Sequence, residues 1–311
     1  MLKPRKFVNE KVEWLKESIG SETAVAAVSG GVDSTVTAVL GHRAVGKRMT
    51  AVFLDDGLMR EGEPQQVYRR FKQLGLNIKL YNLADEFFEA LKGLTDPEEK
   101  RKAFRETFYR SLSRISSEFG AKYLLQGTIA ADVIETKAGA KTQHNVLEQI
   151  DIHPLERYGF KVLEPLKELY KDEVRAVAKE LGLQNEVKRR PFPGPGLSVR
   201  VVGEVTPERV ALVRKATKIV EDETKDIPCF QALAVLMHDK ATGITKEGKR
   251  KYGELIVVRV VQSKDAMTAK SVMLPWKTMQ RIDSRIRGQI PTVTHVLYDL
   301  TGKPPATIEF E

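Results

Sequence analysis

Cysteine is nearly absent from this sequence, since Cys229 is the only one among 311 residues. A single cysteine excludes an internal disulfide framework, a zinc ribbon and any mechanism that needs two thiols of one chain. Long apolar runs are absent as well, because no segment approaches the roughly 20 apolar residues of a membrane-spanning helix. The basic first residues are followed by charged ones, where a signal peptide would be apolar. We therefore expect a cytoplasmic protein that is not attached to a membrane.

Acidic residues are fewer than basic ones, and the formal net charge is +9. A positive field raises the local concentration of anions, either phosphorylated small molecules or nucleic acid. A solvated surface with surplus lysine gives the same count, so charge alone does not choose between these interpretations. Hydrophobic residues at 41% and charged residues at 30% are globular values, and 311 residues are enough for two domains.

The N-terminal part of the chain has the pattern of an α/β domain. An amphipathic helix over residues 7–19 ends at Gly20, and longer segments with helical periodicity follow, including the charged segment 97–118. Between them lie short apolar runs at residues 24–28, 51–54, 78–81 and 123–125. Strands that alternate with helices predict a doubly wound parallel sheet.

A segment rich in proline and glycine divides this part from the rest. Residues 191–196 contain three prolines and two glycines, which neither a helix nor a central strand tolerates. We place the boundary here, with a first domain at 1–190 and a second, smaller α+β domain at 191–311. The second domain is expected to contain a helix around Val210–Val220, another at 276–288, and strands at 232–237, 255–261 and 293–298.

The strongest functional signal follows the first predicted strand directly and precedes a helix. It consists of Ser29, Gly30, Gly31, Val32, Asp33, Ser34 and Thr35. Two glycines let the backbone approach a phosphate closely, and the hydroxyls and the free amides of the helix start can donate to it. Asp33 would repel a bare phosphate, so it predicts a bridging Mg²⁺. The alternative is a glycine turn with a Ser or Asp helix cap.

A second glycine pair imitates a phosphate loop. Gly41 and Gly46-Lys47 match G-x-x-x-x-G-K, but Arg48 follows where a Walker loop needs Ser or Thr. We interpret these glycines as the end of a helix and a connection to the next strand.

The first loop resembles the pyrophosphate loop of the N-type ATP pyrophosphatases, which cleave ATP between the α and β phosphates and adenylate an oxygen of the substrate. Three further segments resemble GMP synthase in particular: Asp-Asp-Gly-Leu-Met-Arg at 55–60, the segment 189–197, and the ending Thr-Gly-Lys-Pro-Pro-Ala-Thr-Ile-Glu-Phe-Glu at 301–311. The resemblance implies an adenine nucleotide alpha hydrolase-like domain followed by a dimerisation domain. It also implies ATP-dependent amination of XMP to GMP through an adenylyl-XMP intermediate, with release of AMP and pyrophosphate.

The resemblance also implies which residues contact ATP. Beside the loop, Gln126, Gly127 and Thr128 would bind the nucleotide, and Asp33 and Asp132 would be catalytic and hold Mg²⁺. A plain strand-to-helix turn is the alternative for 126–128. Residues 135–150 are polar with little apolar periodicity and resemble a mobile lid that shields the intermediate from water.

Two lid residues are further catalytic candidates, Lys141 for the α phosphate and His144. Gln143 departs from the paired histidines of many family members. For Lys141, as for Lys167 and Lys171, a solvated surface position is the alternative. Contacts with XMP are implied for Arg101, Gln231, Lys303 and Glu309.

No glutaminase segment with a Cys/His/Glu triad is recognisable, so the resemblance implies the separate-subunit arrangement that the family shows in archaea. A glutaminase subunit would then supply ammonia, and the chain itself would form a homodimer that binds no nucleic acid. Three other interpretations share the loop. A tRNA-thiolating or lysidine-forming enzyme would explain the positive charge, but the thiolating type usually needs catalytic cysteines. NAD synthetase lacks the Pro-Gly segment and the C-terminal ending. A non-catalytic nucleotide sensor would not need loop, lid and ending together.

Overall fold

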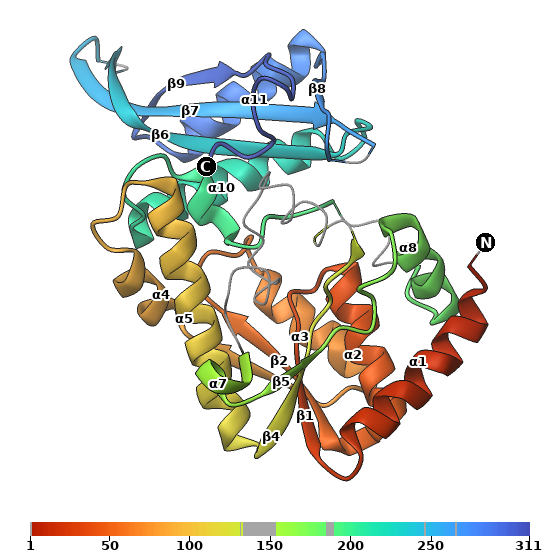
Figure 1. Cartoon of the computed structure of the whole chain (residues 1–311). Coiled ribbons are helices and arrows are strands. Elements are labelled where there is room, and N and C mark those ends of the chain that lie inside the picture. The colour runs from red at the N-terminus through yellow and green to blue at the C-terminus, as the bar shows by residue number, and fades with distance from the viewer. Residues whose placement is uncertain (1, 131, 133–153, 185–189, 246, 265) are drawn as a thin grey trace. The chain divides into compact units, whose positions relative to one another are not determined.

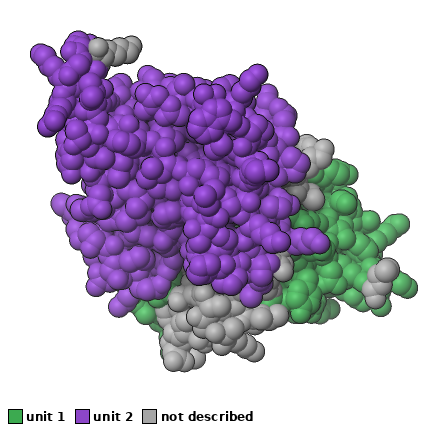
Figure 2. All heavy atoms as spheres, turned by 90° about the horizontal axis from the view of Figure 1, so that it is seen from above, with its two compact units in different colours: residues 1–55, 63–83, 105–189 green, residues 56–62, 84–104, 190–311 purple. Residues whose placement is uncertain are grey.

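The computed structural model describes residues 2–130, 132, 154–184, 190–245, 247–264 and 266–311 (Figure 1). The chain divides into two compact units (Figure 2). Unit 1 comprises residues 1–55, 63–83 and 105–189, and unit 2 comprises residues 56–62, 84–104 and 190–311. The boundary proposed from the sequence stays a prediction, while the segments 56–62 and 84–104 are found in unit 2.

A five-stranded parallel sheet forms the centre of unit 1, with the strand order β3-β2-β1-β4-β5. The strands are β1 Thr23–Ala27, β2 Met49–Asp55, β3 Ile78–Asn82, β4 Ala121–Leu125 and β5 Lys161–Leu163. Three of the five residues of β1 and six of the seven residues of β2 are buried, which explains why these strands read as apolar runs. The doubly wound α/β prediction is confirmed, and β5 is an addition because three residues are too few to show a period.

The helices of unit 1 lie on both faces of this sheet. They are α1 Pro4–Ile19, α2 Val32–Val45, α3 Glu63–Gln73, α7 Pro154–Tyr158 and α8 Lys171–Glu180, with most of α5 Pro97–Glu118. Helices α1, α2 and α8 pack on one another, and α5 lies on the opposite face (Figure 1). Among the described residues, no helix combines the length and apolarity needed to cross a membrane.

The second glycine pair is not a phosphate loop, but the two glycines differ. Gly46 has φ 57° and caps the C-terminus of α2 before the short 3-10 helix η1 Gly46–Arg48, as predicted. Gly41 instead lies inside α2, so the prediction that it ends the helix is wrong. A Cβ there would stand 2.4 Å from Cδ2 of Leu125, so glycine allows α2 to pack closely against β4.

Unit 2 is built on a mixed sheet in which β7 is the common neighbour. Strand β7 Arg250–Gln262 pairs antiparallel with β6 Gln231–Ile244 and with β8 Lys270–Ser271, and parallel with β9 Val293–Tyr298. Helix α10 Pro207–Glu223 packs on β6, and α11 Trp276–Gln289 packs on α10 and β9. The unit also contains α4 Ala84–Leu91 and the 3-10 helix η3 Gly196–Arg200. The predicted strands and helices of this part are confirmed, and β6 and β7 extend beyond the apolar runs into exposed, polar ends.

Candidate active site

The loop between β1 and α2 is cross-linked by its own side chains. Gly30 has φ 75°, a conformation that only glycine adopts without strain. The Oγ of Ser34 accepts a hydrogen bond from Ser29 N at 3.2 Å and donates one to Gly31 O at 3.1 Å. Thr35 Oγ1 donates to the same carbonyl at 2.8 Å. These bonds fix the loop in a bend that leads into the N-terminus of α2, where free amides and the helix dipole favour an anion.

A second loop, which follows β4, touches the first. A Cβ on Gly127 would stand 2.8 Å from the carbonyl carbon of Asp33 and from the backbone nitrogen of Ser34. Thr128 beside it is fully buried. The two loops leave the carboxyl ends of neighbouring parallel strands, where doubly wound folds bind their ligands.

Gln126 is less accessible than the sequence suggested. It is buried, and its Nε2 donates to the hydroxyl of Tyr109 at 2.8 Å. Burial raises the pKa of Tyr109, so this phenol stays protonated. The amide nitrogen of Gln126 is thus committed to the core of unit 1, and a nucleotide contact through this side chain stays a prediction.

Asp33 is held by a cation that comes from distant sequence. Its Oδ2 lies 2.6 Å from Nζ of Lys171, the first residue of α8. The other oxygen, Oδ1, is buried and has no hydrogen-bond partner among the described residues. The sequence alone did not decide between a surface position and a functional one for Lys171, and the structure places it at the loop.

Asp33 and Asp132 fit a Mg²⁺ ion whose remaining coordination positions are filled by phosphate oxygens and water. Mg²⁺ is bound by one or two carboxylates together with phosphate oxygens and waters, and Oδ1 of Asp33 is a buried carboxylate oxygen that no described donor satisfies. Asp132 Oδ2 accepts a hydrogen bond from Ile129 N at 3.0 Å, closing the turn after β4. Within the described part of the chain, no group of three or more His, Cys, Asp or Glu could hold a metal alone. Lys141, His144 and the rest of 135–150 lie outside the described residues.

Two of the four expected XMP contacts meet in unit 2. Gln231 Nε2 donates to Glu309 Oε1 and to Pro191 O, each at 3.2 Å. Glu309 also accepts two bonds from Arg200, from Nε at 2.8 Å and from Nη2 at 2.9 Å. The last residues of the chain therefore carry a carboxylate to the first residue of β6.

Arg101 and Lys303 have other partners. Arg101 pairs with Glu98 one turn earlier on α5. Lys303 donates from Nζ to Ala266 O at 2.9 Å, and its backbone forms an antiparallel bridge with Ala269. Direct contact joins only Gln231 and Glu309 within the expected set, as far as the described residues extend.

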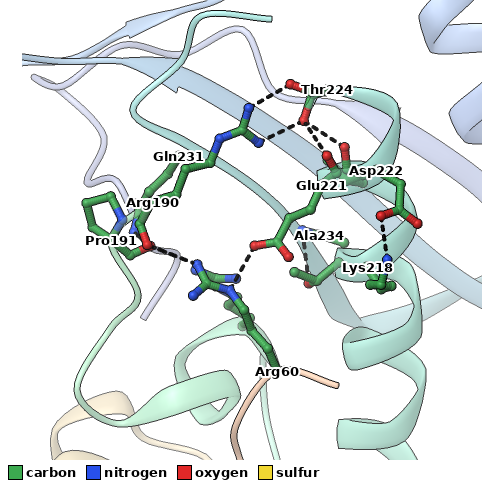
Figure 3. Close-up of polar contacts among 12 residues, drawn as sticks. Arg60, Arg190, Pro191, Lys218, Glu221, Asp222, Thr224, Gln231 and Ala234 are labelled. Carbon is green, nitrogen blue, oxygen red and sulfur yellow. Dashed lines mark hydrogen bonds and ion pairs between the residues drawn. The ribbon is translucent and has the colours of Figure 1, made fainter. Parts of the chain in front are cut away.

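A cluster of arginines around the Pro-Gly segment is the feature that sequence reasoning missed. Arg60 donates to Pro191 O at 3.1 Å and pairs with Glu221 at 2.8 Å (Figure 3). The guanidinium carbons of Arg60 and Arg200 lie 4.3 Å and 4.9 Å from the ring centre of Phe192. Burial lowers the pKa of Arg60, while Glu221 acts in the opposite direction. Arg60 and Phe192 lie in the segments that carried the family resemblance, but their partners are distant in sequence.

The parallel sheet with its Ser-Gly-Gly-Val-Asp-Ser loop defines an ATP pyrophosphatase domain. In agreement, the family model described as NAD synthase matches residues 4–204. The model described as GMP synthase C terminal domain matches residues 217–310. The two matches together account for both units.

Curated relatives match over the full length, and each is named as one subunit of a glutamine-hydrolyzing GMP synthase. The chain is 51% identical to this subunit from Methanopyrus kandleri, with 100% of each chain covered. It is 49% identical to the corresponding subunit from Pyrococcus furiosus, covering 98% of this chain and 97% of the relative. For Archaeoglobus fulgidus the identity is 51%, covering 98% and 99%. The chain belongs to this family of GMP synthase subunits.

Proposed function

We propose that this chain uses ATP to aminate XMP to GMP, as the ligase subunit of a two-subunit GMP synthase. The reaction adenylates an oxygen of the purine, and ammonia then displaces AMP. The observation that carries the proposal is the cross-linked loop at residues 29–35, with the partly exposed Asp33 at the start of α2, whose Oδ1 is buried and has no hydrogen-bond partner among the described residues. Membership of the GMP synthase subunit family supports the choice of substrate.

In the first step the loop holds the leaving pyrophosphate. The hydroxyl of Ser29 and the amides that open α2 donate to its oxygens, and the Ser34 hydroxyl joins them when its single hydrogen turns away from Gly31 O. Asp33 and Asp132 would hold Mg²⁺, which supplies positive charge to the phosphate oxygens. Lys171 balances Asp33 and remains beside the loop as a second cation for the phosphates.

Unit 2 would hold XMP while its oxygen is adenylated, and in the second step it would hold the adenylyl-XMP intermediate, which must be shielded from water. Gln231 and Glu309 form the contact pair, and Arg101 and Lys303 supply positive charge for the nucleotide phosphate. Residues 135–150 close over the intermediate, with Lys141 at the α phosphate and His144 as a proton-transfer candidate.

Ammonia comes from a separate glutaminase subunit, a partner implied by the naming of the relatives as one subunit of a glutamine-hydrolyzing enzyme. A homodimer formed through unit 2 is supported by apolar side chains exposed on its sheet, Ile244, Tyr252 and Leu297. The single cysteine is consistent with a cytoplasmic location.

The test is to incubate the chain with ATP, Mg²⁺ and ammonium, adding XMP, deamido-NAD or tRNA in separate reactions. AMP and pyrophosphate should appear together only with XMP. Formation of ADP and orthophosphate would overturn the reaction class, and turnover with deamido-NAD or tRNA would overturn the substrate. Glutamine should replace ammonium only when the glutaminase subunit is added.

A further inference from the structure

Arg200 donates two hydrogen bonds to the carboxylate of Glu309, and its own side chain is buried. Its side chain is 1% exposed, whereas that of Glu309 is 16% exposed. The Nε and Nη2 groups reach separate oxygens of the carboxylate, at 2.8 Å and 2.9 Å, in the parallel geometry of a bidentate pair. The ring of Phe192 covers the guanidinium, 4.9 Å from its carbon. A ligand can therefore reach Glu309, while Arg200 acts from behind it.

The bidentate pair also sets the orientation of Gln231. Both neighbours of Nε2 are acceptors, Pro191 O and Glu309 Oε1, so this end of the amide must be the donating NH₂. The other end, Oε1, is buried and has no hydrogen-bond partner among the described residues. Turning the carboxylate of Glu309 would remove one of the two acceptors that hold this amide in place.

Charge gives a second reason for the pair. XMP carries a phosphate and an anionic purine, and an isolated carboxylate in its site would repel both of these negative charges. A guanidinium bonded to both oxygens compensates that negative charge and keeps the carboxylate plane fixed.

We propose that Arg200 is a positioning residue of the XMP site, which acts through Glu309 and, through Glu309, on Gln231. This inference rests on the proposed function, in which Gln231 and Glu309 contact XMP. Arg200 does not touch XMP, and its contribution is to hold the acceptor and donor atoms of these two side chains in one arrangement.

A purely structural role is the competing explanation, because other buried cations also hold the C-terminal segment 299–311. Arg259 is fully buried and donates to Thr307 O at 2.7 Å and to Ile308 O at 3.0 Å. It grips the backbone of the segment rather than the carboxylate of Glu309. Arg259 thus provides a matched control for loss of anchoring alone.

The experiment measures the dissociation constants of XMP and ATP by calorimetry on the full chain. Its variants are Arg200→Lys, Glu309→Gln and the double variant. Lysine keeps the charge but loses the two-point grip, so Arg200→Lys should weaken XMP binding by about 10-fold or more and leave ATP binding within about twofold. In the Glu309→Gln background, the same change should weaken XMP binding by less than about twofold, because the interaction has already been broken.

The control Arg259→Lys should lower the unfolding temperature and leave XMP affinity within about threefold. Unchanged XMP affinity in Arg200→Lys, or an undiminished effect in the Glu309→Gln background, would overturn the inference. If Arg200→Lys does not fold, Glu309→Asp breaks the two-point geometry from the other side, and wild-type XMP affinity in that variant would also overturn it. Failure of the wild-type chain to bind XMP would instead refute the proposed function.

Discussion

The loop at residues 29–35 in unit 1 and the C-terminal segment 299–311 in unit 2 are built in opposite ways. The loop is fixed by hydrogen bonds between residues two to five positions apart, and its one long-range ion pair among the described residues, Asp33 with Lys171, is partly exposed. The segment is fixed by buried cations from three separate places in the chain, Lys100, Arg200 and Arg259. We therefore expect that substitutions in the loop have little effect on folding, whereas substitutions that unpair the buried charges of the C-terminal segment destabilise the fold.

The comparison has an energetic basis. An ion pair that is partly in water contributes about 0–1 kcal/mol, since solvent screens both charges. Removal of one partner of a buried pair costs about 3–5 kcal/mol, because the other charge stays buried and uncompensated. Changes in the loop should therefore affect turnover first, and changes in the segment should affect folding first.

Removal of residues 303–311 should have the largest effect. It takes the carboxylates of Glu309 and Glu311 from Arg200 and Lys100, and carbonyl acceptors from Arg259. We expect the free energy of unfolding to fall by more than about 5 kcal/mol, since more than one buried cation loses its partner. Denaturant unfolding, followed together with XMP binding, checks this. A truncated chain of normal stability that only fails to bind XMP would show that the segment is a ligand contact and no more.

Asp33→Asn should show the reverse pattern. Turnover should fall by about 100-fold or more, the scale of one preorganised charge contact in a transition state. The free energy of unfolding should change by less than about 1 kcal/mol, because the Asp33–Lys171 pair is partly exposed. Release of AMP at saturating ATP and XMP measures the first quantity, and thermal unfolding measures the second.

Asp172→Asn is the matched control for this change. Asp172 follows Lys171, and its side chain is 93% exposed. Its replacement should alter neither turnover nor stability. A large loss of stability in Asp33→Asn would contradict the expectation that changes in the loop affect turnover before they affect folding.

The same contrast explains what the sequence could predict. The loop was recognisable because its glycines and hydroxyls are neighbours in sequence and need no distant partner. Strands β1 to β4 were recognisable because buried parallel strands are continuously apolar. Two of the ion pairs could not be predicted in this way. Lys171 and Asp33 are 138 positions apart, and Arg200 and Glu309 are 109 positions apart, so no local sequence pattern indicates either pair.

In the C-terminal segment the sequence indicated two residues that lie in contact, while their assignment to an XMP site stays a prediction. The resemblance singled out Glu309 and Gln231, which the structure finds in contact. It gave no role to Arg200, which lies at the end of η3, beyond the Pro-Gly segment 191–196 and outside every motif that the sequence indicated. The side chain of Arg200 is only 1% exposed, and this burial is the reason to assign it a role. Burial depends on the packing of distant segments, so the neighbouring sequence does not reveal it.

A pair of glycine substitutions sharpens the comparison at smaller scale. Gly127→Ala places a methyl group 2.8 Å from the backbone at the start of α2. We expect a loss of about 1–3 kcal/mol of stability from overpacking, and weaker ATP binding because the two loops must separate. Gly288→Ala in α11 of unit 2 meets nothing within 4 Å and should instead stabilise the chain by about 0.5–1 kcal/mol. Thermal unfolding of both variants and ATP calorimetry decide the matter, and equal behaviour of the two would contradict the close contact.

The smallest effect is expected from a carboxyl of unit 2, Glu223, whose side chain is 12% exposed and whose two arginine partners are exposed to 53% and 36%. Arg281 and Arg285 donate to Glu223 at 2.6 Å and 2.8 Å, and they hold the pKa of this carboxyl below its ordinary value. A lowered pKa contributes stability above the unfolded value of 4.5, and this contribution is lost as the pH falls below that value. Glu223→Gln should therefore cost less than about 1 kcal/mol at neutral pH, and the cost should shrink in urea titrations as the pH approaches 4.5 and falls below it. Glu89→Gln, which removes an exposed pair with Lys92, is the control and should show no such dependence. A stability cost that does not change with pH would mean that Glu223 contributes through packing and not through its charge.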